Sequence, residues 1–304
     1  MSGYAAATVV SEPPSPEDAF EAGRVLAGRD RVDGSMGGGG MARVYRAHDL
    51  ERAQVVAVKV LHASHSQDRE AVLRFRREVA MARRLDHPNI VTILDSGALE
   101  DGRDFVVMEA LDGETLEARL AREGRLPWRA AVSLLGELLL GLRHAHERGV
   151  VHRDIKPENL FLLRGDGPRV KILDFGAAKL YANAPINMLI TQRGVTIGAP
   201  LYMSPEQALA GEVTPASDVY SATVVLFEML TGELPFVRST AAATMKAHVF
   251  ARAPKLRDAA PDLEVPDELE DLVRRGLAKP PISRIPTAAA YLELLEELTA
   301  AHPG

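Results

Sequence analysis

The residues best suited to chemistry lie in one short polar stretch, His152-Arg153-Asp154-Ile155-Lys156-Pro157-Glu158-Asn159. Its carboxylate, Asp154, can accept a proton from a hydroxyl group, and Lys156 can stand beside a transferring phosphoryl group. Asn159 offers an amide oxygen of the kind that binds Mg²⁺. The stretch follows an apolar run, and Pro157 disfavours the continuation of a helix. We therefore expect a loop that carries an acid–base residue, a cation and a metal ligand.

A polar loop that only caps two helices would explain an isolated Asp-x-Lys pattern equally well. The eight-residue string as a whole, however, resembles the catalytic loop of protein kinases, and Lys156 resembles its serine/threonine form. Over roughly residues 30–300 the chain is therefore similar to the bacterial eukaryotic-like (Hanks-type) serine/threonine protein kinases. The resemblance implies an α+β, bilobal protein kinase-like fold. A small β-rich lobe would carry one long helix, and the larger lobe would be mostly helical.

A glycine-rich run and a β-rich run precede this loop. Residues 36–45 contain four consecutive glycines, and residues 54–61 alternate as a strand does. Glycines suit a hairpin whose backbone approaches phosphate oxygens closely, although alone they would indicate a flexible linker. Together the two runs resemble the phosphate-covering loop and the β3 lysine of kinases. By this resemblance the nucleotide-binding residues are Gly37, Gly39, Val44, Ala57, Lys59, Glu78, Glu109, Leu111 and Phe161, and Ala42 replaces the third loop glycine.

A helix is expected over residues 68–85, where Glu78 resembles the glutamate that pairs with the β3 lysine. Strands over residues 91–96 and 105–108 follow, joined by a turn with the hairpin signal Asp101-Gly102. The resemblance makes Met108 the gatekeeper. The backbone that meets adenine would then be that of Glu109 and Leu111, with Gly113 at the crossing between the lobes.

The second half of the chain has mainly helical periodicity. Helices are expected over residues 116–123, 127–148, 239–250, 267–277 and 287–299, and a short strand over residues 170–173. This strand leads into Asp174-Phe175-Gly176, and its distance from the catalytic loop resembles the family's spacing. The resemblance implies that Asn159 and Asp174 hold Mg²⁺, with Mn²⁺ as an acceptable substitute, and that ATP is the cofactor.

The segment from Asp174 to Glu206 resembles the activation segment of kinases. It ends in Ser204-Pro205-Glu206, and the resemblance implies that Glu206 pairs with a distant arginine, Arg284. By the same resemblance Asp218 begins the central helix and holds the catalytic-loop backbone. Arg153 would receive a phosphorylated residue of the activation segment. The candidates for this regulatory phosphorylation are Thr191 and Thr196.

Composition narrows the classes of protein. The 42 acidic and 36 basic residues give a net charge of −6, which does not predict binding to nucleic acid. The chain contains no cysteine, so the sequence favours the cytoplasm and predicts neither a disulfide framework nor a thiolate metal site. Its apolar runs are too short to span a bilayer, and residues 1–10 do not resemble a secretory signal.

We predict three regions: a mobile tail over residues 1–28, a small lobe over residues 29–112 and a large lobe over residues 113–302. A helix that starts after a Ser15 cap and runs over residues 16–26 is compatible with this tail. The expected partners are proteins with Ser or Thr acceptors. The resemblance is also compatible with a homodimer formed through the small lobe.

Besides Ala42, three positions depart from the family pattern. Ala199 lacks the hydroxyl that would bridge the catalytic aspartate and the loop lysine, at a cost of about 1 kcal/mol. Thr223 replaces a glycine of the central helix, and Phe161 replaces an aliphatic residue below the adenine. Ala199 favours the rival hypothesis of a pseudokinase that binds nucleotide or partners without efficient phosphoryl transfer. A small-molecule phosphotransferase is a third hypothesis, and it would not require Ser204-Pro205-Glu206, Arg284 or Arg153.

Overall fold

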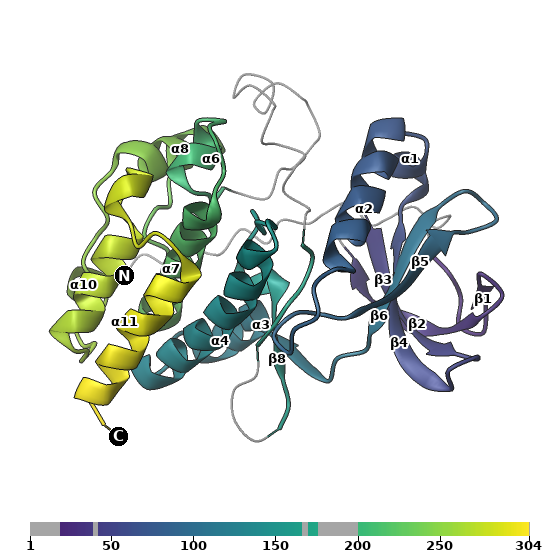
Figure 1. Cartoon of the computed structure of the whole chain (residues 1–304), viewed down its shortest axis with the longest axis horizontal. Helices are drawn as coiled ribbons and strands as arrows, with labels where there is room; N and C mark the ends of the chain where they lie inside the picture. Colours follow the sequence, from purple (N-terminus) through teal and green to yellow (C-terminus); the bar gives the residue numbers. More distant parts are fainter. Residues whose placement is uncertain (1–18, 39–41, 166–169, 176–199, 304) are drawn as a thin grey trace. The chain divides into compact units, whose positions relative to one another are not determined.

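The computed structural model describes residues 19–38, 42–165, 170–175 and 200–303, apart from the side chains at positions 74 and 78. The chain forms two compact units, a β-rich one and a mostly helical one (Figure 1). The first unit joins the chain up to Val79 with Ile93–Ala110, and the second joins Ala80–Thr92 with the chain from Leu111 onward. This is the α+β, bilobal protein kinase-like fold that the sequence predicts.

An antiparallel six-stranded sheet builds the first unit, in the order β1-β2-β3-β4-β6-β5. Val56, Val58 and Val60 of the central strand β4 are almost completely buried, because β-branched side chains pack well on a pleated surface. The strands are β1 (Val25–Leu26), β2 (Asp30–Gly38), β3 (Ala42–Asp49), β4 (Gln54–Leu61), β5 (Ile93–Ala98) and β6 (Asp104–Glu109).

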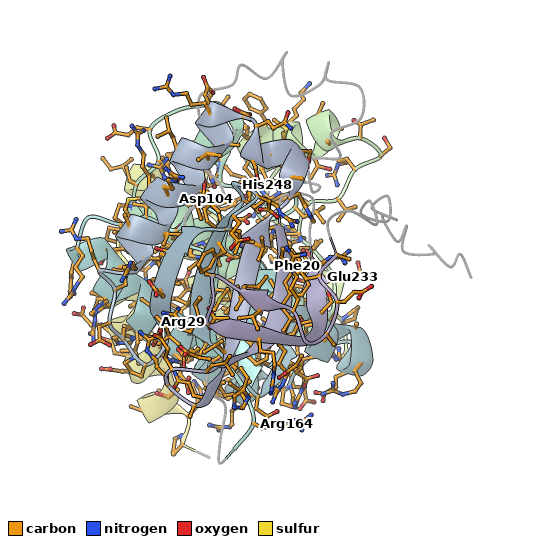
Figure 2. The ribbon with its side chains drawn as sticks, turned by 90° about the vertical axis from the view of Figure 1, so that its right-hand side faces the viewer. Phe20, Arg29, Asp104, Arg164, Glu233 and His248 are labelled. Carbon is orange, nitrogen blue, oxygen red and sulfur yellow. The ribbon has the colours of Figure 1, made fainter. Side chains whose placement is uncertain are left out.

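The first described residues pack on this sheet, so the prediction of a mobile tail over residues 1–28 is wrong for residues 19–28. Phe20 is 7% exposed, and its ring centroid lies 5.3 Å from that of Tyr45 in β3 (Figure 2). The guanidinium groups of Arg24 and Arg103 lie 4.8 and 4.4 Å from the centroid of the Phe20 ring. The apolar burial of this ring gives residues 19–28 a fixed place on the sheet.

The predicted helix over residues 16–26 is also wrong where the structure describes it. Residues 19–24 are irregular, and residues 25–26 form β1, which pairs with β2. The backbone N–H of Gly23 donates to the carbonyl of Val32 at 2.8 Å, and Val32 donates back to Arg24 at 2.8 Å. Pairing with an existing strand gives these backbone groups hydrogen-bond partners. A short isolated helix would leave such groups without partners at its two ends.

Two helices accompany the sheet, α1 (Ala63–Ser66) and α2 (Arg69–Ala82). The second is the predicted long helix, and the carboxylate of Asp68 accepts hydrogen bonds from the backbone N–H groups of Glu70 and Ala71 at its start. Arg76 donates to the buried carboxylate of Asp104 in β6 at 3.0 Å, which fixes the helix against the sheet (Figure 2).

Helices α4, α7 and α11 form the centre of the second unit, where they pack side by side (Figure 1). Almost every residue of α7 is buried, as expected for a helix that is surrounded by other helices. The helices are α3 (Leu116–Glu123), α4 (Trp128–Glu147), α6 (Pro205–Ala208), α7 (Pro215–Thr231), α8 (Ala241–Phe250), α9 (Leu256–Ala259), α10 (Asp267–Gly276) and α11 (Ala288–Ala301), with short 3₁₀ turns η2 (Pro157–Asn159) and η4 (Pro281–Ser283).

The central helix begins at Pro215, three positions before the predicted start at Asp218. Thr214 precedes it, and the backbone N–H of Thr214 donates to the side chain of Ser217 at 3.2 Å, as in a capping box. Asp218 therefore lies in the first turn, where its charge interacts favourably with the helix dipole. Across the described residues, no helix has both the length and the apolar character needed to cross a membrane.

A small three-stranded sheet consists of β7 (Gly113–Thr115), β8 (Leu160–Leu163) and β9 (Val170–Ile172). Strand β8 directly follows the predicted catalytic loop, and β9 leads to Asp174. A Cβ atom at Gly113 would lie only 1.9 Å from the carbonyl oxygen of Leu162. Because β7 approaches β8 this closely, only glycine fits at position 113.

The side chain of Thr223 in the central helix packs against a glycine of another helix. A Cβ atom on Gly276 of α10 would lie 2.2 Å from the Oγ1 atom of Thr223. The threonine is fully buried, and its hydroxyl donates to the carbonyl of Val219 one turn earlier at 2.7 Å. Its extra volume is thus accommodated by a residue without a side chain, and its polar atom is satisfied.

Candidate active site

The three chemical groups of the predicted catalytic loop lie together. The Nζ atom of Lys156 is 3.1 Å from the Oδ2 atom of Asp154. The amide nitrogen of Asn159 donates to the same Oδ2 atom at 2.9 Å and to the backbone carbonyl of Asp154 at 2.8 Å. Asp154 and Lys156 keep about a third of their side-chain surface exposed, at 30% and 31%, whereas Asn159 is buried. The loop therefore presents a hydrogen-bonded carboxylate to solvent.

The charge of Lys156 is maintained by its neighbours. Partial burial alone would lower the pKa of this amine, but the carboxylate of Asp154 more than offsets that effect. The net result is that the pKa of Lys156 lies above its usual value, with smaller contributions from Glu158 and Asp174. Lys156 is thus a permanent cation beside Asp154 at physiological pH.

Two residues of the site have a left-handed backbone that is rare for residues other than glycine. Arg153 has φ of 71° and Asp174 has φ of 51°. Such conformations cost roughly 1–3 kcal/mol and persist only where the surrounding structure enforces them. The side chain of His152 connects the two segments, because its Nε2 atom lies 2.8 Å from the carbonyl oxygen of Leu173 and its ring packs edge-on against Phe175 at 4.7 Å.

Asp218 holds the backbone of the predicted catalytic loop through hydrogen bonds. Its completely buried carboxylate accepts hydrogen bonds from the backbone N–H groups of His152 and Arg153, each at 2.8 Å. The Nε2 atom of His146 lies 2.8 Å from the same carboxylate. Burial by itself raises the pKa of Asp218, but the hydrogen bond and the charge of His146 and the backbone donors hold the pKa below its usual value.

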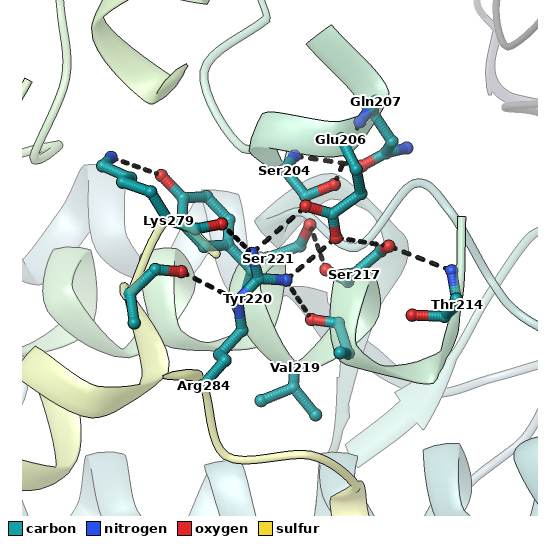
Figure 3. Close-up of polar contacts among 12 residues, drawn as sticks. Ser204, Glu206, Gln207, Thr214, Ser217, Val219, Tyr220, Ser221, Lys279 and Arg284 are labelled. Atoms are coloured by element: carbon teal, nitrogen blue, oxygen red, sulfur yellow. Dashed lines mark hydrogen bonds and ion pairs between the residues drawn. The ribbon is translucent and has the colours of Figure 1, made fainter. Parts of the chain in front are cut away.

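Glu206 and Arg284 form the expected buried ion pair (Figure 3). Two guanidinium nitrogens of Arg284 donate to the two carboxylate oxygens at 2.9 and 3.1 Å, and Ser217 donates to Oε1 at 2.6 Å. Burial would raise the pKa of Glu206, yet Arg284 and Ser217 hold it below its usual value. Arg284 also donates to the carbonyl of Ala216, so this pair connects α6 to α7.

In the first unit, three of the predicted nucleotide-binding residues form a row across neighbouring strands. Gly37 of β2 lies opposite Val44 of β3, which lies opposite Lys59 of β4. Ala57, two residues before Lys59, projects to the same side of β4 because side chains alternate along a strand. Glu109 ends β6, the strand that pairs with β4, and Leu111 is the second residue after it.

In the second unit, Phe161 lies in β8, opposite Thr115 of β7 and Lys171 of β9. The predicted residues Gly39, Thr191, Thr196 and Ala199 lie outside the described residues. Glu78 belongs to α2, but its side chain lies outside the described part as well.

Three residues that fix the site were not predicted from the sequence. They are His146, which reaches Asp218, Gln207, whose side chain donates to the carbonyl of Arg153 at 2.7 Å, and Glu137, which accepts from the backbone of Val170 at 2.7 Å. His146 and Glu137 lie in the long helix α4, where a polar residue is usually on the solvent face. In the sequence, the signal that could have indicated these two roles was a polar side chain inside an apolar stretch of a helix.

Residues 31–294 match the protein kinase domain family, to which the chain therefore belongs. Among its relatives, it is 38% identical over 271 residues to the serine/threonine-protein kinase pkn3 of Myxococcus xanthus, with 88% of this chain and 50% of that protein covered. It is 37% identical over 266 residues to the serine/threonine-protein kinase PrkC of Bacillus subtilis, with 88% and 40% covered. The chain thus spans about half or less of the length of these curated relatives.

The fold is similar to solved structures as well. The kinase domain of Mycobacterium tuberculosis PknI matches with a TM-score of 0.73 and 27% identity, over 92% of this chain and all of that domain. The order of motifs, the fold and the relatives agree on a bacterial Hanks-type serine/threonine kinase domain.

Proposed function

We propose that this domain transfers the γ-phosphoryl group of ATP to Ser and Thr hydroxyls of proteins. The observation that carries the proposal is the arrangement of Asp154, Lys156 and Asn159 on a loop held by Asp218. The relatives named above are serine/threonine-protein kinases. This chain has Lys59, Asp154 and Asn159 at positions that resemble the motifs of that family. The pseudokinase hypothesis has no support from this geometry.

In the proposed mechanism Asp154 orients the acceptor hydroxyl and takes its proton, and Lys156 stabilises the charge on the transferring group. Lys59 and the backbone at Gly37 position the phosphates of the nucleotide. Because phosphoryl transfer needs little covalent help from the protein, most of the rate comes from positioning and charge stabilisation.

The donor atoms of the second unit fit a magnesium ion. The amide nitrogen of Asn159 is committed to Asp154, which leaves the amide oxygen as the atom of this side chain that can bind a cation. Asp174 supplies a carboxylate, and Mg²⁺ prefers such oxygen ligands. When bound, the ion neutralises the negative charge of the ATP phosphates.

Incubation of the full chain with Mg²⁺, labelled ATP and a general protein substrate tests the proposal. Asp154→Asn removes the base but keeps the size of the side chain, so we expect transfer to fall by about 10²-fold or more. Lys59→Met should have an effect of similar size. Thermal unfolding near that of the wild type serves as the control for folding. Turnover like that of the wild type in either variant would contradict the assigned roles.

We also propose autophosphorylation of the activation segment at Thr191 or Thr196, with Arg153 as the cation that receives the phosphate. Arg153 fits this role because its backbone is fixed by both Asp218 and Gln207. Phosphopeptide mapping of the wild type beside Asp154→Asn checks this, and label at neither threonine would argue against the switch. We further propose a homodimer, on the ground of the resemblance, and a cytoplasmic location, which the lack of cysteine in the sequence favours.

A further inference from the structure

Lys279 lies among aromatic rings instead of beside an acid. Its Nζ atom is 3.8 Å from the centroid of the Phe236 ring and 5.4 Å from that of Tyr220. It donates a hydrogen bond to the Tyr220 hydroxyl at 3.2 Å (Figure 3). Within the described part of the chain, no carboxylate lies within ion-pair distance of this amine. Among the described residues, Lys279 therefore has no carboxylate of the kind that usually stabilises the charge of a buried lysine.

A short hydrogen-bonded chain extends from the amine into the protein. The Oη atom of Tyr220 lies 3.0 Å from the Nδ1 atom of His248, which is completely buried. Burial lowers the pKa of His248 to about 4, so its ring is neutral and accepts the proton of the Tyr220 hydroxyl. That arrangement leaves the Tyr220 oxygen to accept from Lys279. The amine can make this donation in its neutral form as well as in its charged form.

The surroundings of Lys279 disfavour its positive charge. Burial, followed by the charge of Arg284, lowers the pKa of Lys279 to about 7. The guanidinium of Arg284 lies 4.9 Å from the Tyr220 ring, and it also donates to the carbonyl of Lys279 at 3.0 Å. The faces of the Phe236 and Tyr220 rings attract the ammonium and act in the opposite direction. Arg284 is in turn paired with Glu206, so this carboxylate is not available to the lysine.

We propose that Lys279 is a site of covalent acylation by small acyl phosphates. A bond forms between the Nζ atom and the carbonyl carbon, the bond from that carbon to the phosphate oxygen breaks, and the amine proton leaves on the phosphate. The residue keeps part of its surface exposed, and a small donor would approach the amine from that side. The product is a neutral amide whose N–H can keep the hydrogen bond to Tyr220, so it suits a site that disfavours charge.

The chain contains matched reference residues for a test. Lys246 and Lys255 are exposed lysines of the same unit and serve as the reference amines. Lys279 is followed by Pro280, where trypsin does not cleave, so the peptide of residues 276–284 is released in both the acylated and the unmodified state. Its two forms can therefore be quantified directly in one mass spectrum.

The experiment incubates the full chain with acetyl phosphate between pH 6.5 and pH 9 and follows acetylation of each lysine by peptide mass spectrometry. At pH 7 we expect Lys279 to react about tenfold faster than Lys246 and Lys255, because a larger share of its amine is uncharged. Its rate should level off above about pH 8, whereas the rates at the two exposed lysines should continue to rise.

The same reaction in guanidinium chloride is the control, since unfolding removes Phe236, Tyr220 and Arg284 from the neighbourhood of the amine. We expect the preference for Lys279 to disappear there. A rate at folded Lys279 equal to or below that of Lys246 and Lys255 would overturn the proposal. A preference that persists after unfolding would overturn it too, because the tertiary environment would then not be its cause.

Discussion

At the scale of single residues, the pKa of each buried carboxylate in the second unit depends on the hydrogen-bond donors around it. Glu206 and Asp218 have guanidinium, imidazole or backbone donors that hold each pKa below its usual value. Among the described residues, Glu228 of α7 accepts a side-chain hydrogen bond only from the hydroxyl of Tyr202, at 2.7 Å. Burial therefore raises the pKa of Glu228 to about 7, and the nearby Glu158 and Glu117 add to the effect.

The raised pKa of Glu228 predicts a specific dependence of stability on pH. The folded chain binds this proton more tightly than the unfolded chain does, whose ordinary value is 4.5. The contribution to stability is thus fully present below about pH 4.5 and is lost as the pH rises through about 7. Between pH 5 and pH 8, the free energy of unfolding of the wild type should therefore fall by on the order of 2 kcal/mol more than that of Glu228→Gln.

Denaturant unfolding of the wild type and of Glu228→Gln at several pH values measures this difference. Glu233→Gln is the matched control, because Glu233 is an exposed glutamate shortly after the same helix (Figure 2). Its pH dependence should follow that of the wild type. Parallel curves for Glu228→Gln and the wild type would show that Glu228 is already ionised at pH 5.

At the scale of secondary structure elements, the contact between α7 and α10 depends on two complementary positions. Thr223 adds a hydroxyl and a methyl group to α7, and Gly276 removes a side chain from α10 at the point of contact. Helices approach most closely where one of them carries a small residue. The departure of Thr223 from the family pattern is therefore accommodated by a glycine on the neighbouring helix.

This contact predicts that Gly276→Ala destabilises the domain by about 1–3 kcal/mol, because the new methyl group would overlap with Thr223. Thr223→Gly should also destabilise the domain, because it removes the packing of the threonine side chain and lowers the helical preference at this position. The double variant with Gly276→Ala should nevertheless be more stable than the sum of the two single effects predicts. A double-mutant cycle measured by denaturant unfolding checks the coupling.

Gly136→Ala in α4 is the control for the helical preference of alanine. A Cβ atom at Gly136 would meet no atom within 4 Å, so alanine should be neutral or stabilise the domain by up to about 1 kcal/mol. Additive effects of Gly276→Ala and Thr223→Gly would contradict the direct contact.

At the scale of the whole molecule, the first unit is completed by residues near the start of the described chain. Phe20 belongs to the same apolar cluster as Leu26, Tyr45 and Phe105, which come from strands across the sheet. Two arginines flank its ring, and its backbone N–H donates to the hydroxyl of Tyr45 at 3.2 Å. Residues 19–28 are thus part of the folded domain.

We predict that Phe20→Ala lowers the free energy of unfolding by about 3 kcal/mol, since it creates a cavity beneath both arginines. Phe250→Ala is the matched control, because that ring is 73% exposed and its loss should change stability by less than about 0.5 kcal/mol. Thermal or denaturant unfolding measures both. Equal small effects would mean that residues 19–28 are dispensable for folding.

Much of the local structure follows from the sequence alone. The helix over residues 116–123 and the strand over residues 54–61 have the predicted bounds, because apolar periodicity and local caps determine where such elements run. The ion pair of Glu206 with Arg284 was also predictable, but only because the order of motifs resembles a known family.

Only the tertiary structure decided the properties that depend on contacts between distant parts of the chain. The fixed place of Phe20 requires strands from elsewhere in the unit, and the space for Thr223 requires the facing helix α10. The environment of Lys279 likewise combines α7, the segment between α7 and α8, and the segment before α11. Local patterns cannot encode such neighbours, because burial and charge at a position are set by whichever residues the fold brings beside it.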